Sequence, residues 1–281
     1  MDRAVSGGWW LASDGRWYPP QASAHPATQH IGQHIGSRAL ISVCLIVAMI
    51  AGLALLVDVS RTSTAPAPAA VVAPANPGHI LLAQAVRDAG LQGWVHLEVS
   101  TTHDSTAVVL TGDVGPNEGQ QTLTEGTQSA TVIYVDRVAY VRADSVGLAQ
   151  ATLGDAVSGT AAVGRWVSVT SSEPDYAAVA GGLTLSSALG ELLDWPDQLV
   201  MGRPTTVDGQ QVVPITGEVR LSGGGPMVKA TLDVTHTARP LPVEMNASSA
   251  VTSETVIFSH WGDPVTITAP SGAQPASSLK G

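Results

Sequence analysis

The sequence predicts an α+β fold, in which a large curved antiparallel β-sheet carries helices on one face and a single transmembrane helix precedes the sheet. Three observations support this fold class. Small and β-branched side chains dominate the composition, while aromatic residues make up 4% and charged residues 13%. Segments with period-two alternation form two runs that helical segments separate, as is typical of α+β proteins. An apolar stretch without any charge lies near the N-terminus.

The uncharged stretch from Ala39 to Val57 predicts the transmembrane helix. Its 19 residues would span about 28 Å as an α-helix, close to the roughly 30 Å of bilayer hydrocarbon. A cleaved signal peptide is the alternative, but 38 residues precede the stretch and it exceeds the usual apolar length of about 7–15 residues. Arg38 at its N-terminal edge favours a cytoplasmic N-terminus, with the C-terminal domain on the extracytoplasmic side of the cell membrane.

The net charge of −10 is unevenly distributed along the chain. Residues 1–38 carry three Arg and two Asp, whereas residues 58–281 carry 10 basic and 21 acidic residues. Such an acidic domain repels phosphate backbones, so the sequence predicts no nucleic-acid partner. The single cysteine, Cys44, lies within the apolar stretch, which excludes an intrachain disulfide and a Cys-based metal site.

The N-terminal tail, residues 1–38, contains an aromatic motif at residues 6–20. Two aromatic pairs flank the turn signal Asp14-Gly15, which predicts a hairpin. These pairs are Trp9 with Trp10 and Trp17 with Tyr18. The string resembles a short Trp-rich module of unknown function at the N-termini of actinobacterial membrane proteins. We expect a docking element for a cytoplasmic protein partner; the alternative is a disordered tail whose aromatic rings rest at the membrane interface.

Two further segments are expected to lack a packed fold. Residues 58–77 form a linker rich in Pro and Ala, of which residues 60–77 predict an extended spacer of roughly 50 Å, at about 3.1 Å per residue. Residues 271–281 are expected to form a disordered tail.

Residues 78–270 predict one extracytoplasmic domain. Asn76 as N-cap and Pro77 at the first helical position begin a helix that ends near Gly90. From Trp94 the period changes to two, which indicates a half-buried strand. Helices are expected at 77–89, 144–153, 174–180 and 185–193. Strands are expected at 94–100, 105–114, 120–125, 129–135, 138–142, 165–170, 205–207, 211–221, 227–236, 241–246, 254–259 and 265–268.

Five strings in this domain resemble the actinobacterial LppX/LprG-type lipoproteins, which have a LolA-like fold. The strings are TVIYVDRVAYVRAD (131–144), GRWVSV (164–169), TTVDGQQVVPITGEV (205–219), ARPLPVEM (238–245) and TVIFSHWGDPVTITAP (255–270). The resemblance implies a half-barrel whose helices enclose an apolar cavity for a lipid or an acylated glycolipid. That family is anchored by a lipidated Cys, whereas Cys44 lies inside the apolar stretch. The domain is therefore expected on a permanent tether.

The sequence thus predicts a membrane-tethered extracytoplasmic protein that binds a lipid or lipoglycan in an apolar cavity. Inward-facing strand residues and two helix residues are the candidates for the cavity wall. A shift of one residue in strand register would turn the strand residues to the other face of the sheet. They are Val95, Leu97, Val99, Val109, Ile133, Val135, Leu189 and Leu192. The alternative is an envelope sensor or interaction protein that couples this domain to a cytoplasmic partner.

Catalytic signatures are missing from the sequence. It contains no G-x-S-x-G elbow, P-loop, H-E-x-x-H motif, EF-hand loop or Rossmann fingerprint. His103-Asp104 is interpreted as a pair of turn residues instead of part of a catalytic triad. Trp94 and Trp166 are expected to pack against the sheet. We therefore expect no enzyme activity, cofactor or metal.

Overall fold

The computed structural model describes residues 10–11, 17–18, 76–154, 157–193, 195, 198–220 and 227–279. The chain divides into two compact units, residues 1–35 and residues 36–281. In the first unit, β1 (Trp10–Leu11) pairs antiparallel with β2 (Trp17–Tyr18), with Trp10 opposite Tyr18. The hairpin pairing that the sequence predicts is therefore present.

The predicted transmembrane segment, Ala39 to Val57, and nearly all of the linker at 58–77 lie outside the described residues. Among the helices that the structure does describe, none is both long enough and apolar enough to cross a membrane.

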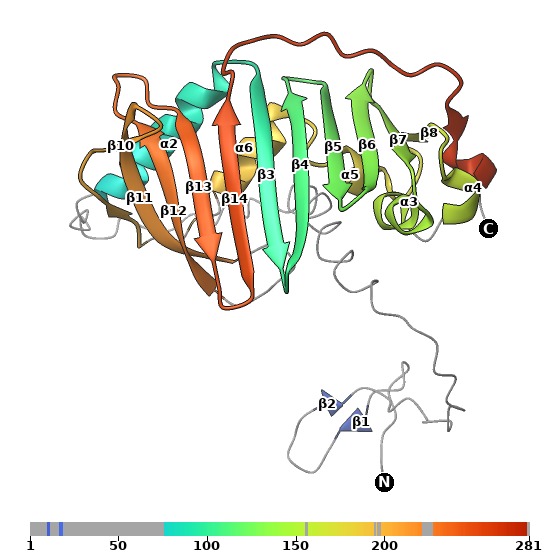
Figure 1. Ribbon diagram of the computed structural model, residues 1–281, viewed down its shortest axis with the longest axis horizontal. Helices are drawn as coiled ribbons and strands as arrows, with labels where there is room; N and C mark the ends of the chain where they lie inside the picture. Colours follow the sequence, from blue (N-terminus) through green and yellow to red (C-terminus); the bar gives the residue numbers. More distant parts are fainter. Residues whose placement is uncertain are drawn as a thin grey trace, which may run out of the picture. The chain divides into compact units, whose positions relative to one another are not determined.

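The second unit combines five short or medium helices with a long series of strands in its described part (Figure 1). The helices are α2 (Pro77–Gly90), α3 (Val146–Leu153), α4 (Gly159–Ala162), α5 (Tyr176–Ala180) and α6 (Leu185–Leu193), with a 3-10 turn η1 (Ala276–Leu279). The strands are β3 (Val95–His103), β4 (Thr106–Val114), β5 (Gly119–Glu125), β6 (Gln128–Val135), β7 (Val138–Ala143), β8 (Val167–Thr170), β9 (Val200–Met201), β10 (Thr205–Val207), β11 (Gln210–Arg220), β12 (Met227–Thr235), β13 (Pro242–Ser248), β14 (Thr252–Ser259) and β15 (Gln274–Pro275).

These strands form one sheet in the order β10-β11-β12-β13-β14-β3-β4-β5-β6-β7-β8-β15, with β9 beside β11. Strands that follow one another in the sequence pair as antiparallel hairpins in both halves of the sheet, as β11 does with β12 and β3 with β4. The first long strand, β3, lies in the middle, where it pairs antiparallel with the last long strand, β14. The α+β half-barrel that the sequence predicts is confirmed.

Helix α2 begins where its local sequence predicts. The Asn76 Oδ1 atom accepts a hydrogen bond from the Gly78 backbone N–H at 2.8 Å, and Pro77 occupies the first helical position. The Asn76 side-chain amide also donates to the Leu199 carbonyl at 2.8 Å. This second bond holds the start of the helix against the segment that leads into β9. The helix buries Leu82, Ala85 and Ala89, which lie three or four residues apart on one side.

All the helices that pack on the sheet share one of its faces, which we call the inner face. Figure 1 shows α2 and α6 behind the half of the sheet around β11–β14 and β3, and α3 near β7. The first core lies under α2 and α6 and contains Leu82, Ala85, Ala89, Val95, Leu97, Leu189, Leu192, Ile215, Leu232 and Phe258. The second core lies under α3, α4 and α5 and contains Leu110, Leu123, Val132, Val141, Leu148, Leu153, Val167, Val179 and Leu183.

Two predictions for the C-terminal segment are wrong. The expected strand at 265–268 is absent, because β14 already pairs with β13 on one side and β3 on the other. The expected disordered tail at 271–281 instead contains β15, which pairs in parallel with β8, and η1. The Ala276 and Leu279 side chains are buried in the second core, and the Ser277 backbone N–H donates to Glu173 Oε1 at 3.0 Å. The tail therefore closes the β8 edge of the sheet.

This ordered tail predicts that Leu279→Ala lowers the free energy of unfolding by about 2 kcal/mol, because it removes a buried apolar side chain from the second core. Urea unfolding of the full chain measures the change. Ser277→Ala is the control, since only the backbone of Ser277 bonds to Glu173, and its effect should stay within about 0.5 kcal/mol. Equal stability of the two variants would contradict a packed tail.

Candidate ligand-binding face

The central strands β13, β14, β3 and β4 place two neighbouring rows of side chains on the inner face. Strand register sets both rows, since residues directly opposite one another share a face. The first row is Leu110, Val99, Val256 and Met245. The second row is Val108, Thr101, Glu254 and Ala247. We call these eight residues the central patch.

The central patch is mostly apolar and lies where the two cores meet. Leu110 and Val108 belong to the second core, and Ala247 belongs to the first. Val99, Val256 and Met245 are half-buried and pack against these cores. Helix α2 contacts β11 and β13, whereas α3 contacts β6 and β7. The patch therefore occupies the middle of the inner face, between the two groups of helices.

Residues 181–185, which we call the strap, cross the inner face where β4 ends and β5 begins. The Leu185 backbone N–H donates to the Gly115 carbonyl at 2.8 Å, and the Gln121 side-chain amide donates to the Gly182 carbonyl at 3.1 Å. Leu183 is buried in the second core and Leu185 in the first. The strap thus connects α5 to α6 and joins the two cores.

Glycine at position 119 allows the strap to lie against the sheet. A Cβ atom on Gly119 would stand 2.2 Å from the Leu183 carbonyl oxygen, which is a backbone atom that cannot rotate away. Only a residue without a side chain fits at this close approach.

Thr101 and Glu254 are the polar members of the central patch. The Thr101 side chain is 9% exposed, and its Oγ1 atom is buried without a hydrogen-bond partner. The two residues lie directly opposite each other in the β3–β14 ladder. Burial among these neighbours raises the pKa of the Glu254 carboxyl above its ordinary value of 4.5. The patch therefore combines an apolar lining with a buried hydroxyl that has no hydrogen-bond partner and a carboxyl that burial desolvates.

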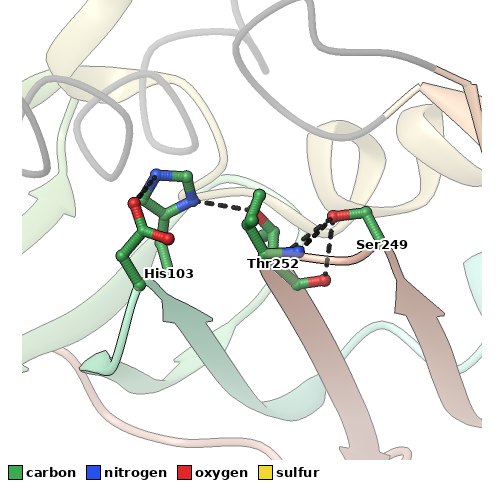
Figure 2. Close-up of polar contacts among 5 residues, drawn as sticks. His103, Ser249 and Thr252 are labelled. Carbon is green, nitrogen blue, oxygen red and sulfur yellow. Dashed lines mark hydrogen bonds and ion pairs between the residues drawn. The ribbon is translucent and has the colours of Figure 1, made fainter.

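A chain of polar contacts lies at the end of the same two strands. Figure 2 shows His103 directed toward Thr252, whose backbone contacts Ser249. His103 Nδ1 and Thr252 Oγ1 are hydrogen-bonded at 2.7 Å, and the Thr252 backbone N–H donates to Ser249 Oγ at 3.0 Å. His103 Nε2 lies 3.4 Å from Asp104 Oδ2. The Asp104 backbone N–H also donates to the Val251 carbonyl, so these contacts join the tips of two hairpins.

The turn interpretation of His103-Asp104 holds for Asp104 alone, because His103 is the last residue of β3. Asp104 and Ser105 have φ angles of 45° and 74°, and they connect β3 to β4 as a two-residue turn. The contact between His103 and Thr252 had no sequence signal, because the two residues are far apart in the chain and only the β3–β14 register brings them together.

The predicted cavity residues divide between the two faces. Val95, Leu97, Leu189 and Leu192 lie together in the first core, and Val99 lies in the central patch. Val109, Ile133 and Val135 lie on the outer face, so their predicted facing is wrong by one residue of register. Ile133 and Val135 pack with Ile267 there, and Trp94, Tyr140 and Trp166 pack against this cluster.

The physical reason for the wrong facing is that β6 is apolar on both sides. Ala130 and Val132 occupy its inner positions, while Ile133 and Val135 on its outer side are covered by the segment that contains Ile267. Alternation alone cannot select the inner face of such a strand. The packing of Trp94 and Trp166 against the sheet, by contrast, is as predicted.

Two other pKa shifts belong to groups outside the central patch. Burial, and then the neighbouring Glu244 carboxylate, raises the pKa of Asp233 on the outer face of β12. Burial, and then a hydrogen bond with Tyr134, raises the pKa of Tyr176 to about 12. The Tyr176 hydroxyl also donates to the Arg137 carbonyl at 3.1 Å, so it fastens α5 to the β6–β7 turn.

The raised pKa of Glu254 predicts a change of stability with pH. A raised carboxyl pKa means that the folded chain binds this proton more tightly than the unfolded chain. The resulting stabilisation is fully present below pH 4.5 and is lost as the pH rises through the folded-state pKa. As the pH rises through this range, the free energy of unfolding of the Glu254→Gln variant should fall less than that of the unchanged protein. Urea unfolding at a series of pH values measures both.

The control for this measurement is Glu98→Gln, which changes an exposed carboxyl on the outer face of β3. Its pH profile should run parallel to that of the unchanged protein. Parallel profiles for Glu254→Gln as well would contradict the burial of the Glu254 carboxyl.

The close approach of the strap predicts that Gly119→Ala lowers the free energy of unfolding by about 1–3 kcal/mol, since the strap must move off β5. Gly190→Ala in α6 is the control, because no atom lies within 4 Å of the added Cβ there. That variant should be as stable as the unchanged protein or more stable by roughly 0.5–1 kcal/mol. Thermal and urea unfolding compare the two, and a stable Gly119→Ala variant would contradict the strap contact.

No protein-family model matches the chain, and no curated protein matches it significantly. Among solved structures, the chain is similar to LprF from Mycobacterium bovis, with 16% identity and a TM-score of 0.41 over 69% of this chain and 97% of that one. It is also similar to the lipoprotein LppX from Mycobacterium tuberculosis, with 18% identity and a TM-score of 0.42 over 68% and 99%. A DUF1329 family protein from Desulfovibrio piger matches with 7% identity and a TM-score of 0.31 over 68% and 96%. The resemblance to LppX/LprG-type lipoproteins that the sequence strings indicate is thus also found among solved structures.

Proposed function

We propose that the domain at 78–270 is an extracytoplasmic binding module that holds a lipid or an acylated glycolipid against its inner face. The central patch is the observation that carries this proposal. Val99, Val256 and Met245 are half-buried, apolar and adjacent in register on that face. An acyl chain laid along them would gain about 0.8 kcal/mol for each methylene group removed from water.

The composition of the patch fits a ligand that is mostly apolar. Small-molecule sites are lined mainly by apolar side chains, with a few polar groups that fix the orientation of the ligand. Thr101 and Glu254 are the polar groups here, and six of the eight patch residues are apolar. We propose binding without a chemical step, because an apolar lining holds a ligand and does not activate it.

The tether is the second part of the proposal. A helix from Ala39 to Val57, followed by the linker at 58–77, would keep this module on the extracytoplasmic side of the membrane. The support is the length of the uncharged stretch and the position of Arg38 at its N-terminal edge. A tethered module can hold a lipid close to the membrane and present it to a partner.

Native mass spectrometry of the full chain tests the proposal. The chain is purified in a polyoxyethylene detergent, incubated with dioleoylglycerol and released from the detergent in the gas phase. We expect a one-to-one adduct with the lipid. Absence of an adduct would overturn the proposed function.

A matched pair of variants locates the binding face. Val256→Asp places a charge in the central patch, whereas Ile257→Asp places the same charge on the exposed outer face of the same strand. The first should abolish the lipid adduct and the second should retain it, because only the patch charge is desolvated by an acyl chain. If Val256→Asp does not fold, Val256→Thr replaces it. This smaller change should weaken the lipid adduct. Equal adducts in all three variants would place the lipid elsewhere.

A further inference from the structure

Thr101 and Glu254 are unusual for the inner face of a sheet, where apolar side chains are the rule. Resting on the proposed function, we propose that these two residues recognise the polar head of the ligand, and that the head is uncharged and carries a hydroxyl group. The inference names the chemistry of the head group and the two side chains that select it.

The unpaired hydroxyl of Thr101 is the first support. The side chain is nine-tenths buried, and its Oγ1 atom has no hydrogen-bond partner. Buried polar atoms in native proteins are nearly always paired, and an unpaired atom calls for an explanation such as a ligand. A hydroxyl group on the ligand can donate to Oγ1 or accept from it.

The position of Glu254 is the second support. Its Cα lies directly opposite that of Thr101 across β14 and β3, and residues so paired have Cβ atoms about 4.5–5.5 Å apart. One ligand hydroxyl can therefore contact both side chains. An ionised carboxyl accepts a hydrogen bond from that hydroxyl, and a protonated carboxyl can donate one to it.

The charges around the pair argue against an anionic head group. Glu125 pairs with Val108, so a second carboxyl lies on the same row of the inner face. Lys229 and Arg142 lie on the outer face by register. His103, in the next row, is already engaged by Thr252 and Asp104. A phosphate or carboxylate head would thus meet carboxyl groups without a balancing cation from these strands.

The order of the rows gives the ligand a direction. Residues two apart along a strand are separated by about 6.6 Å, so the row of Thr101 and Glu254 lies that far from the apolar row of Val99 and Val256. The hairpin tips with His103 and Thr252 lie beyond the polar row. We therefore place the head group near the tips and the acyl chains toward the strap.

A competition between two lipids with the same acyl chains tests the inference. The full chain in a polyoxyethylene detergent is incubated with equimolar dioleoylglycerol and dioleoylphosphatidic acid, and native mass spectrometry measures the ratio of the two adducts. The unchanged protein should favour dioleoylglycerol, whose head carries a hydroxyl in place of the phosphate. A preference for phosphatidic acid would overturn the inference.

Two variants and two matched controls assign the preference to residues. Thr101→Val should lower the dioleoylglycerol adduct about three- to tenfold, the effect of losing one hydrogen bond. Glu254→Gln keeps the shape and removes the charge, so the adduct ratio should move toward phosphatidic acid. Thr102→Val and Glu98→Gln change the same residue types at exposed outer positions of β3 and should leave the ratio unchanged.

The possible outcomes separate this inference from the proposed function. Absence of both lipid adducts from the unchanged protein overturns the proposed function and the inference with it. Adducts whose ratio stays the same in Thr101→Val and Glu254→Gln overturn the inference alone. If either variant fails to fold, as judged by its thermal unfolding, Thr101→Ser and Glu254→Asp replace it. The first should retain the preference for dioleoylglycerol, and the second should weaken it; a reversal of this order also overturns the inference.

Discussion

The pairing of β3 with β14 joins the first and last long strands of the sheet, and most of the other features of the domain depend on it. It extends over eight residue pairs, from Thr252 opposite His103 to Ser259 opposite His96. Because side chains alternate between faces, this one register decides which residues of both strands face the helices. It also places Thr101 opposite Glu254, and His103 beside Thr252. A shift by one residue would place the two members of each polar pair on opposite faces and dissolve the central patch.

The division of the inner face into two cores follows from the same topology. Since β3 and β14 occupy the middle of the sheet, α2, which precedes β3, covers one half together with α6, and α3, α4 and α5 cover the other. The strap is held by a backbone hydrogen bond from Leu185 to Gly115 and a side-chain hydrogen bond from Gln121, and its Leu183 and Leu185 side chains join the two halves. It holds the cores together at one end of the central strands, and the polar hairpin tips join the strands at the other end. The apolar rows between these two points are the surface on which the proposed ligand would lie.

Local sequence signals predict the parts of this fold that depend on neighbours in the chain. The Asn76 cap, the bounds of α6 and the turn at Asp104 each arise from residues within a few positions. The facing of Ile133 and Val135 was not predictable, because β6 is apolar on both sides and a distant residue, Ile267, covers its outer side. The packed tail was missed for a similar reason: Ala276 and Leu279 form a short apolar pair whose partners belong to the second core. The pairing of Thr101 with Glu254 depends on strand register alone, which sequence periodicity does not provide.

The presence of a carboxyl and an unpaired hydroxyl in an apolar patch is best understood as a conflict between stability and binding. A β-branched apolar residue at position 254 would fit between Val256 and Ala247 without the desolvation that raises the pKa of Glu254. A valine at position 101 would keep the shape of threonine and remove the unpaired Oγ1 atom. Both substitutions would remove a poorly accommodated polar group from an apolar surface. Residues that lower stability in this way tend to occur at functional sites. The nearest neighbours of the pair on this face, Val99, Val256 and Val108, are apolar. The polar pair therefore supports the proposal that this face contacts a ligand with a polar head.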